Sequence, residues 1–106
     1  MAKYLIQGNY VGGSAEGLLK EGGSSRRAAI EELVSSVGGS IEAFYYAFGE
    51  VDVLVIANLP DNVTAAALSL IVNASGSVAV KVTVLLAAEE IDAATKKSVT
   101  YRPPGK

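Results

Sequence analysis

The sequence predicts an α+β fold in which strands and helices follow the order β-α-β-β-α-β. Three observations carry this prediction. Strand-like runs are bounded by glycine, two segments have the apolar spacing or alanine content of helices, and one Gly-X pair separates two adjacent strand-like runs. The chain is long enough to bury one core, and we expect a single domain over residues 1–106.

The N-terminal half is predicted to hold one strand and a broken helix. Residues 3–10 (KYLIQGNY) have the composition of a strand, and Ser14 is expected to cap a short helical turn. Residues 20–23 (KEGG) interrupt the helix. It resumes with apolar residues three and four positions apart, which are Ile30, Leu33, Val34 and Val37. The pair Gly38-Gly39 then supplies the left-handed end that helices favour.

The C-terminal half is predicted to begin with two strands folded about Gly49-Glu50, a pair suited to a tight hairpin turn. Asp61 is placed to cap a helix over residues 63–75, and residues 78–86 (VAVKVTVLL) have the composition of a last strand. The resulting order is that of a ferredoxin-like domain, in which the helices lie on one face of an antiparallel sheet.

A further helix and an extended arm are expected after these elements. Glu89-Glu90 and Lys96-Lys97 stand near the two ends of a helical segment, where their charges suit the helix dipole. Residues 99–106 (VTYRPPGK) cannot continue a helix because of their prolines. We expect Tyr101 in this arm to dock on a neighbouring subunit.

Composition limits the possible partners. Half of the residues are hydrophobic and only 19% are charged, so we expect apolar surface beyond what one small core can bury, and therefore self-association. The net charge of −2 and the lack of a lysine or arginine run give no electrostatic footprint for a phosphate backbone or an anionic membrane. We therefore expect no nucleic-acid partner and no membrane partner.

The chain contains neither cysteine nor histidine, which restricts its chemistry. Thiolate nucleophiles, disulfides, Cys/His metal sites and Ser-His relays are excluded. We expect no metal and no cofactor, since heme would find only Tyr or Met ligands. Residues 1–10 do not have the pattern of a secretory signal, and the longest apolar run, residues 51–57 with Asp52 interrupting it, is too short to span a bilayer. We expect a soluble cytoplasmic protein.

Strand parity predicts that both faces of the sheet are apolar. With the turn at Gly49-Glu50, facing residues of the hairpin share a side of the sheet. One side carries Phe44, Tyr46, Phe48, Val51, Val53, Val55 and Ala57. The other side carries Ile41, Ala43, Tyr45, Ala47, Asp52, Leu54, Ile56 and Asn58. Because two helices cover only one face, we expect the other face to meet a second copy of the chain.

The sequence resembles the GYD-domain family over nearly its whole length, from KYLIQGNY through GGSSRRAAIEELVSSVGG and FYYAFGEVDVLVIANLPDNVTAAALSL to YRPPG. At the hairpin, where the family has its Gly-Tyr-Asp signature, the chain has Gly49 and Asp52 but Val51 in place of the tyrosine. The resemblance implies a ferredoxin-like protomer whose sheet pairs with that of a second protomer in a dimeric α/β barrel. It implies a fold similar to that of cofactor-free monooxygenases and isomerases, and no known reaction.

Asp52 and Tyr45 are the candidate catalytic residues. A carboxylate beside a hairpin turn, on a face with Leu54 and Ile56, has the chemistry of a general base, and Tyr45 shares that face. The alternative is that Asp52 accepts hydrogen bonds that hold the turn.

Three strand residues are candidate ligand-binding groups. Lys81 lies in the middle of an apolar strand, where it either belongs to a pocket or protects an edge strand against unwanted pairing. Gln7 and Asn9 alternate with apolar residues on the first strand, where they either line a small polar cavity or make ordinary hydrogen bonds at a sheet face or subunit contact.

The segment GGSSRRAAI, residues 22–30, has two interpretations. It lacks the glycine and lysine spacing of phosphate-binding loops, and Ser24 or Ser25 is expected to cap the resumed helix while Arg27 pairs with Glu31. Arg26 and Arg27 beside a helix start also suit a bound carboxylate or phosphate.

Two functions remain open on this evidence. The first is a homo-oligomeric domain that binds a small ligand between its sheet and helices. The alternative is a cofactor-free monooxygenase- or isomerase-like enzyme for a small aromatic or carbonyl compound, with Asp52 as base and Tyr45 or Arg26 orienting the substrate.

Overall fold

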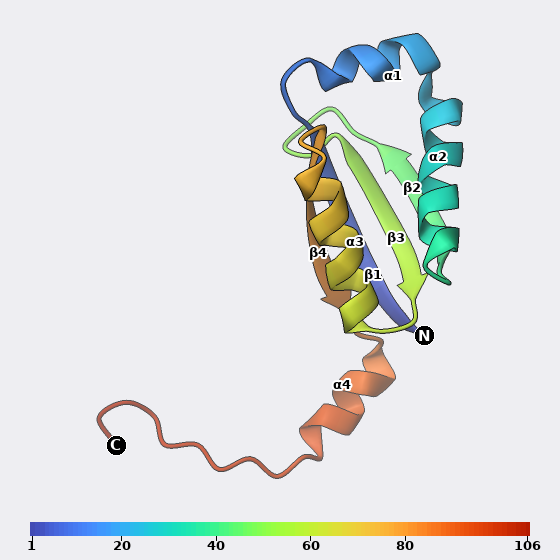
Figure 1. Ribbon diagram of the computed structural model, residues 1–106. Coiled ribbons are helices and arrows are strands. Elements are labelled where there is room, and N and C mark those ends of the chain that lie inside the picture. Colours follow the sequence, from blue (N-terminus) through green and yellow to red (C-terminus); the bar gives the residue numbers. More distant parts are fainter.

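The computed structural model describes residues 1–106 and has the predicted α+β composition, with a four-stranded antiparallel sheet and four α-helices (Figure 1). In chain order the elements are β1 (Ala2–Tyr10), the 3₁₀ turn η1 (Gly12–Ser14), α1 (Ala15–Glu21), α2 (Gly23–Ser36), β2 (Ser40–Tyr46), β3 (Val53–Leu59), α3 (Asn62–Ala74), β4 (Val78–Leu85) and α4 (Ala88–Thr95). None of the helices combines the length and the apolar character needed to cross a membrane.

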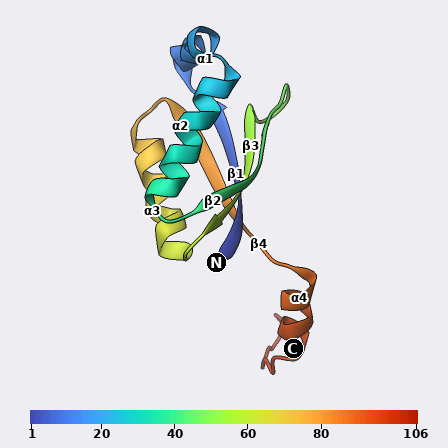
Figure 2. The same cartoon turned by 90° about the vertical axis from the view of Figure 1, so that its right-hand side faces the viewer.

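The strands are ordered β2-β3-β1-β4, and every neighbouring pair is antiparallel. Helices α2 and α3 lie on the same face of this sheet, and no element covers the opposite face (Figure 2). We call that opposite face the open face. Helix α4 and the residues after it extend away from the sheet and its two helices (Figure 1).

The core lies between the sheet and these two helices. Alternate residues of β1 and β3 point towards α2 and α3, because successive side chains of a strand point to opposite faces. The buried residues of the core are Tyr4, Ile6, Val34, Val55, Ala57, Leu59, Ala65 and Leu68. Tyr4 is the largest of them, and its hydroxyl donates to Asn62 Oδ1 over 2.6 Å, which satisfies the polar end of an otherwise apolar ring.

The predicted register of the β2–β3 hairpin is confirmed near its turn and wrong at its far end. Tyr46 pairs with Val53 and Phe44 with Val55, as parity predicts. A bulge between Ile41 and Ala43 then shifts the register by one residue. As a result Ile41 pairs with Ala57 and packs against the core, whereas the sequence placed it on the open face.

The hairpin turn is also looser than the predicted two-residue turn. The last backbone link is from Ala47 N to Asp52 O, at 2.9 Å, so residues 48–51 form the turn. The tight turn expected at Gly49-Glu50 requires a positive φ at its first central residue, and Gly49 does not have one.

Two of the predicted helix caps are wrong. Helix α2 begins at Gly23 directly after Gly22, so Ser24 and Ser25 lie inside its first turn and no side chain caps it. Ser14 makes no capping bond to α1 either, because η1 continues directly into that helix. The Ser14 hydroxyl instead donates to Ser77 O at 2.6 Å, and thereby ties η1 to the start of β4.

Other predicted helix boundaries are confirmed. Asp61 caps α3 by accepting a hydrogen bond from Thr64 N at 2.8 Å. Gly38 follows α2 with a φ of 81°, and Gly76 follows α3 with a φ of 75°, both in the left-handed region that only glycine adopts without strain.

Candidate functional site

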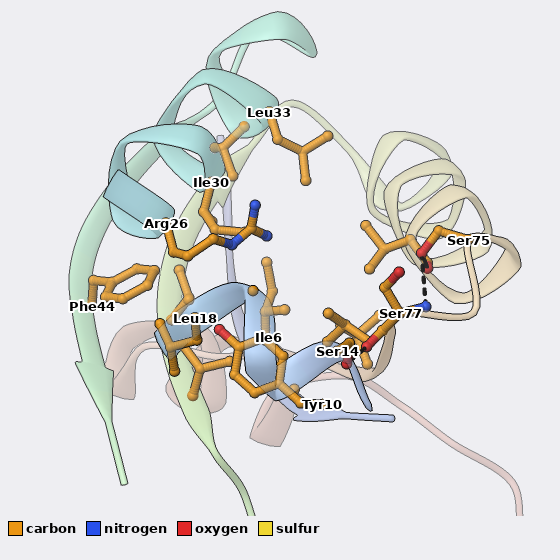
Figure 3. Close-up of a pocket in the computed structure, with 18 of the residues that line it drawn as sticks. Ile6, Tyr10, Ser14, Leu18, Arg26, Ile30, Leu33, Phe44, Ser75 and Ser77 are labelled. Carbon is orange, nitrogen blue, oxygen red and sulfur yellow. Dashed lines mark hydrogen bonds between the residues drawn. The ribbon is translucent and has the colours of Figure 1, made fainter. Parts of the chain in front are cut away.

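A cavity of about 560 Å³ lies on the helix-covered face of the sheet (Figure 3). The sheet forms its floor, α2 and α3 form its two sides, and α1 closes one end. Fifteen of its 22 lining residues are hydrophobic. The cavity is therefore mostly apolar, and its lining residues come from all four strands and from α1, α2 and α3.

One residue of the cavity floor, Gly8, contributes no side chain. Gly8 lies between Val53, Val78 and Val80, and an added Cβ at Gly8 would come within 3.0 Å of Val53 Cγ1. The side walls come from the inward stripes of the two helices, which include Ile30 and Leu33. The apolar residues whose spacing predicts α2 therefore also form one wall of the cavity.

Polar groups gather towards the α1 end of the cavity. Arg26 of α2 and Glu21 of α1 are the charged lining residues, and their closest atoms, Arg26 Nε and Glu21 Oε2, are 3.8 Å apart. The guanidinium of Arg26 reaches into the cavity, while Ser75 and Ser77 lie on the opposite side (Figure 3). The Arg26 side chain is 29% exposed, so it is only partly hydrated.

Two tyrosines complete this polar end. The Tyr46 hydroxyl donates to Gly23 O at 2.9 Å, and its ring packs edge-on against Phe44. Burial raises the pKa of Tyr46, the nearby Tyr10 raises it further, and Arg26 lowers it. The Tyr46 hydroxyl is therefore neutral at physiological pH and can donate a hydrogen bond. The effects of Tyr10 and Arg26 on its pKa place the three side chains close together.

Asp52 and Asn9 meet at the hairpin turn. Asp52 Oδ2 accepts a hydrogen bond from Tyr10 N at 2.9 Å, and Asp52 N donates to Asn9 Oδ1 at 3.0 Å. These bonds join the start of β3 to the end of β1. Neither residue is among those that line the cavity.

Three further candidate residues lie together on the open face. The strand pairings connect Tyr45 with Leu54, Leu54 with Gln7, and Gln7 with Lys81, so these four residues form one row across the sheet. Tyr45 is 70% exposed, and Lys81 is exposed on the edge strand β4. The row is on the opposite face from the cavity.

Of the two predicted arginines, only Arg26 reaches the cavity. Arg27 instead pairs with Glu31 on α2, with Arg27 Nε 3.9 Å from Glu31 Oε1, as the spacing predicts. The predicted residues therefore fall into three separate places: the cavity, the turn and the open face.

Sequence reasoning missed the roles of Tyr10, Glu21 and Ser77 at the cavity. Strand parity alone could have placed Tyr10 on the cavity face, because Tyr10 lies on the same side of the first strand as Tyr4 and Ile6. The contributions of Glu21 and Ser77 depend on how α1 folds back towards the start of β4, which no sequence pattern specifies. No group of three or more acidic residues is arranged to hold a metal ion.

A family model described as GYD domain matches residues 4–95, which include β1 from Tyr4 onward, all of β2 to β4 and every cavity-lining residue. Neither a comparison with curated proteins nor one with solved structures gives a match.

Proposed function

The chain belongs to the GYD-domain family, and from this premise we propose that it is a homo-oligomeric domain that binds a small, largely apolar molecule between its sheet and helices. The observation that carries the proposal is the cavity of about 560 Å³ on the helix-covered face. Its volume is within the range of roughly 300–1,000 Å³ that is typical of small-molecule sites. Its walls are apolar and its few polar groups converge at one end, as such sites require.

The assembly is proposed from the open face. The protomer is a ferredoxin-like single domain over residues 1–106, and the strand order β2-β3-β1-β4 with both covering helices on one face supports this. Its open face carries the half-buried side chains of Leu5, Leu54 and Ile56 beside Tyr45. Burying each large aliphatic side chain contributes about 1.5–3 kcal/mol. A second copy supplies the matching apolar surface, and the two sheets then form the dimeric α/β barrel.

Light scattering on wild type and two lysine variants tests the assembly. Leu54→Lys places a charge at the centre of the open face, and we expect it to yield monomers because burying an unpaired ammonium is costly. Val63→Lys on α3 is the matched control, since Val63 is exposed away from the sheet. A Leu54→Lys protein that keeps the wild-type mass contradicts the proposed interface.

Ligand binding in the cavity is tested with a neutral aromatic probe, naphthalene carboxamide. Val72→Phe fills part of the cavity, and we expect it to weaken binding of the probe, measured by calorimetry. Leu70→Phe is the control because Leu70 is on the same helix but is exposed and does not line the cavity. Equal binding to both variants and to wild type argues against this site.

The alternative function is a cofactor-free monooxygenase- or isomerase-like enzyme. Such an enzyme needs a base at its substrate cavity. Asp52 has its carboxylate hydrogen-bonded to the Tyr10 amide, and neither Asp52 nor Tyr45 lines the cavity. This placement favours binding over catalysis by these two residues. The cytoplasmic location expected from the sequence stays a prediction.

A further inference from the structure

We propose that the ligand of the cavity is a carboxylate with an apolar body, and that Arg26 binds its head group. This inference rests on the proposed function and specifies the chemical class of the molecule that the cavity holds. It is argued from the position of the Arg26 guanidinium in the cavity, its partial burial and its loose pairing with Glu21.

Arg26 is the only basic residue that lines the cavity. Its guanidinium projects from α2 into a space whose walls are mostly aliphatic and aromatic (Figure 3). A guanidinium that is partly removed from water gains more from an anionic partner than an exposed one does, since fewer water molecules compete for it. The apolar walls hold the body of the ligand, and the arginine holds its charged end.

The ion pair inside the protein leaves Arg26 able to take this partner. Its closest approach to Glu21 is 3.8 Å and involves Nε, which is too long for a hydrogen bond. The two terminal nitrogens, which give guanidinium its bidentate match to a carboxylate, project towards the cavity in Figure 3. Glu21 is thus a loose counter-ion that a ligand carboxylate replaces at shorter distance.

The neighbouring hydroxyls determine which donors assist Arg26. The Tyr46 hydroxyl is engaged with Gly23 O, and the Ser14 and Ser75 hydroxyls donate to Ser77 O and Val72 O. Tyr10 also lines the cavity, and its hydroxyl makes no hydrogen bond within the protein, which leaves it free to add a second contact to the head group. One arginine and one phenol suit a carboxylate better than a phosphate, which needs more donors to balance its charge.

A matched pair of ligands tests the charge requirement by calorimetry. Naphthalene carboxylate and naphthalene carboxamide have nearly the same shape and differ in charge. We expect wild type to bind the carboxylate about tenfold more tightly than the amide, as one charge-assisted contact in a partly dry site provides. Arg26→Gln is expected to abolish this preference, and Arg27→Gln to preserve it, because Arg27 pairs with Glu31 outside the cavity.

Glu21→Gln is expected to change the carboxylate preference in the direction opposite to Arg26→Gln. Removing the competing carboxylate is expected to increase the preference for naphthalene carboxylate over the amide several-fold. If the amide binds as well as the carboxylate, or if Arg26→Gln leaves the preference intact, the carboxylate assignment is overturned while the cavity proposal stands. If neither compound binds, both are overturned.

Discussion

The position of Asp52 could be predicted from the sequence, whereas its hydrogen-bond partner could not. Its position beside the hairpin turn follows from strand parity and is confirmed by the backbone link from Ala47 N to Asp52 O. Its partner does not follow from parity, because the bond from Tyr10 N to Asp52 Oδ2 depends on how β1 ends beside the turn. Catalysis by Asp52 and Tyr45 stays a prediction, whereas the hydrogen bonds that hold the turn are present.

Replacing Asp52 with alanine is expected to destabilise the fold by about 1–3 kcal/mol, because the Tyr10 amide loses its acceptor. Urea unfolding measures the change, and Glu50→Ala in the same turn is the control because Glu50 is exposed. We expect binding of naphthalene carboxamide to persist in Asp52→Asn. Should any turnover by the protein vanish in Asp52→Asn while its stability is unchanged, the enzyme alternative would be favoured instead.

The cap of α3 gives a pH dependence with a defined sign. Hydrogen bonds from Thr64 lower the pKa of Asp61 below its ordinary value of 3.8. A lowered pKa in the folded state stabilises the protein above the unfolded pKa, and this contribution is lost as the pH falls through the folded pKa. Asp61→Asn keeps a capping oxygen but cannot titrate. Its stability is expected to fall less steeply than that of wild type below about pH 4, measured by acid-dependent urea unfolding. Parallel curves would contradict this.

At the scale of elements, periodic patterns were reliable and local irregularities were not. The apolar spacing of residues 30–37 predicted α2, and the alternation in residues 51–58 predicted β3 with its buried side. The bulge near Glu42 inverts the side of Ile41 without leaving any periodic signal. The predicted start of α2 was also wrong, because Gly22 is both the C-cap residue of α1 and the N-cap residue of α2.

Gly38 and Gly39 illustrate two reasons for a glycine at one junction. Gly38 has the left-handed φ that the sequence predicted for the pair, whereas Gly39 lacks it and is needed for close approach. A Cβ at Gly39 would lie 2.6 Å from Asn58 O and 2.7 Å from Leu59 Cδ2. We therefore expect Gly39→Ala to destabilise the fold by about 1–3 kcal/mol through overpacking. Gly49→Ala, which meets no atom within 4 Å, is the control in thermal unfolding. An equal effect of the two substitutions would refute the packing explanation.

At the scale of the whole molecule, the chain is more extended than its length requires. Its radius of gyration is 17.0 Å, against about 13 Å for a compact domain of 100 residues. The difference reflects α4 and the arm after it, which project away from the sheet (Figure 1). Ile91, Val99 and Tyr101 are exposed along this projection. The prolines of the sequence predicted the arm.

Deleting residues 99–106 is expected to weaken the assembly, because the exposed Tyr101 is the side chain expected to dock on a neighbouring subunit. Analytical ultracentrifugation over a dilution series measures the dissociation constant, and deletion of residues 105–106 is the control. The arm prediction is wrong if both truncated proteins assemble as wild type does.

Native mass spectrometry of the purified full chain tests the central claim most directly, because it reports subunit number and retained small molecules together. The account predicts a dimer or a larger assembly that carries a small bound mass, with that mass lost in Arg26→Gln and kept in Arg27→Gln. A monomer without any bound mass would contradict both the open-face interface and the ligand-binding cavity.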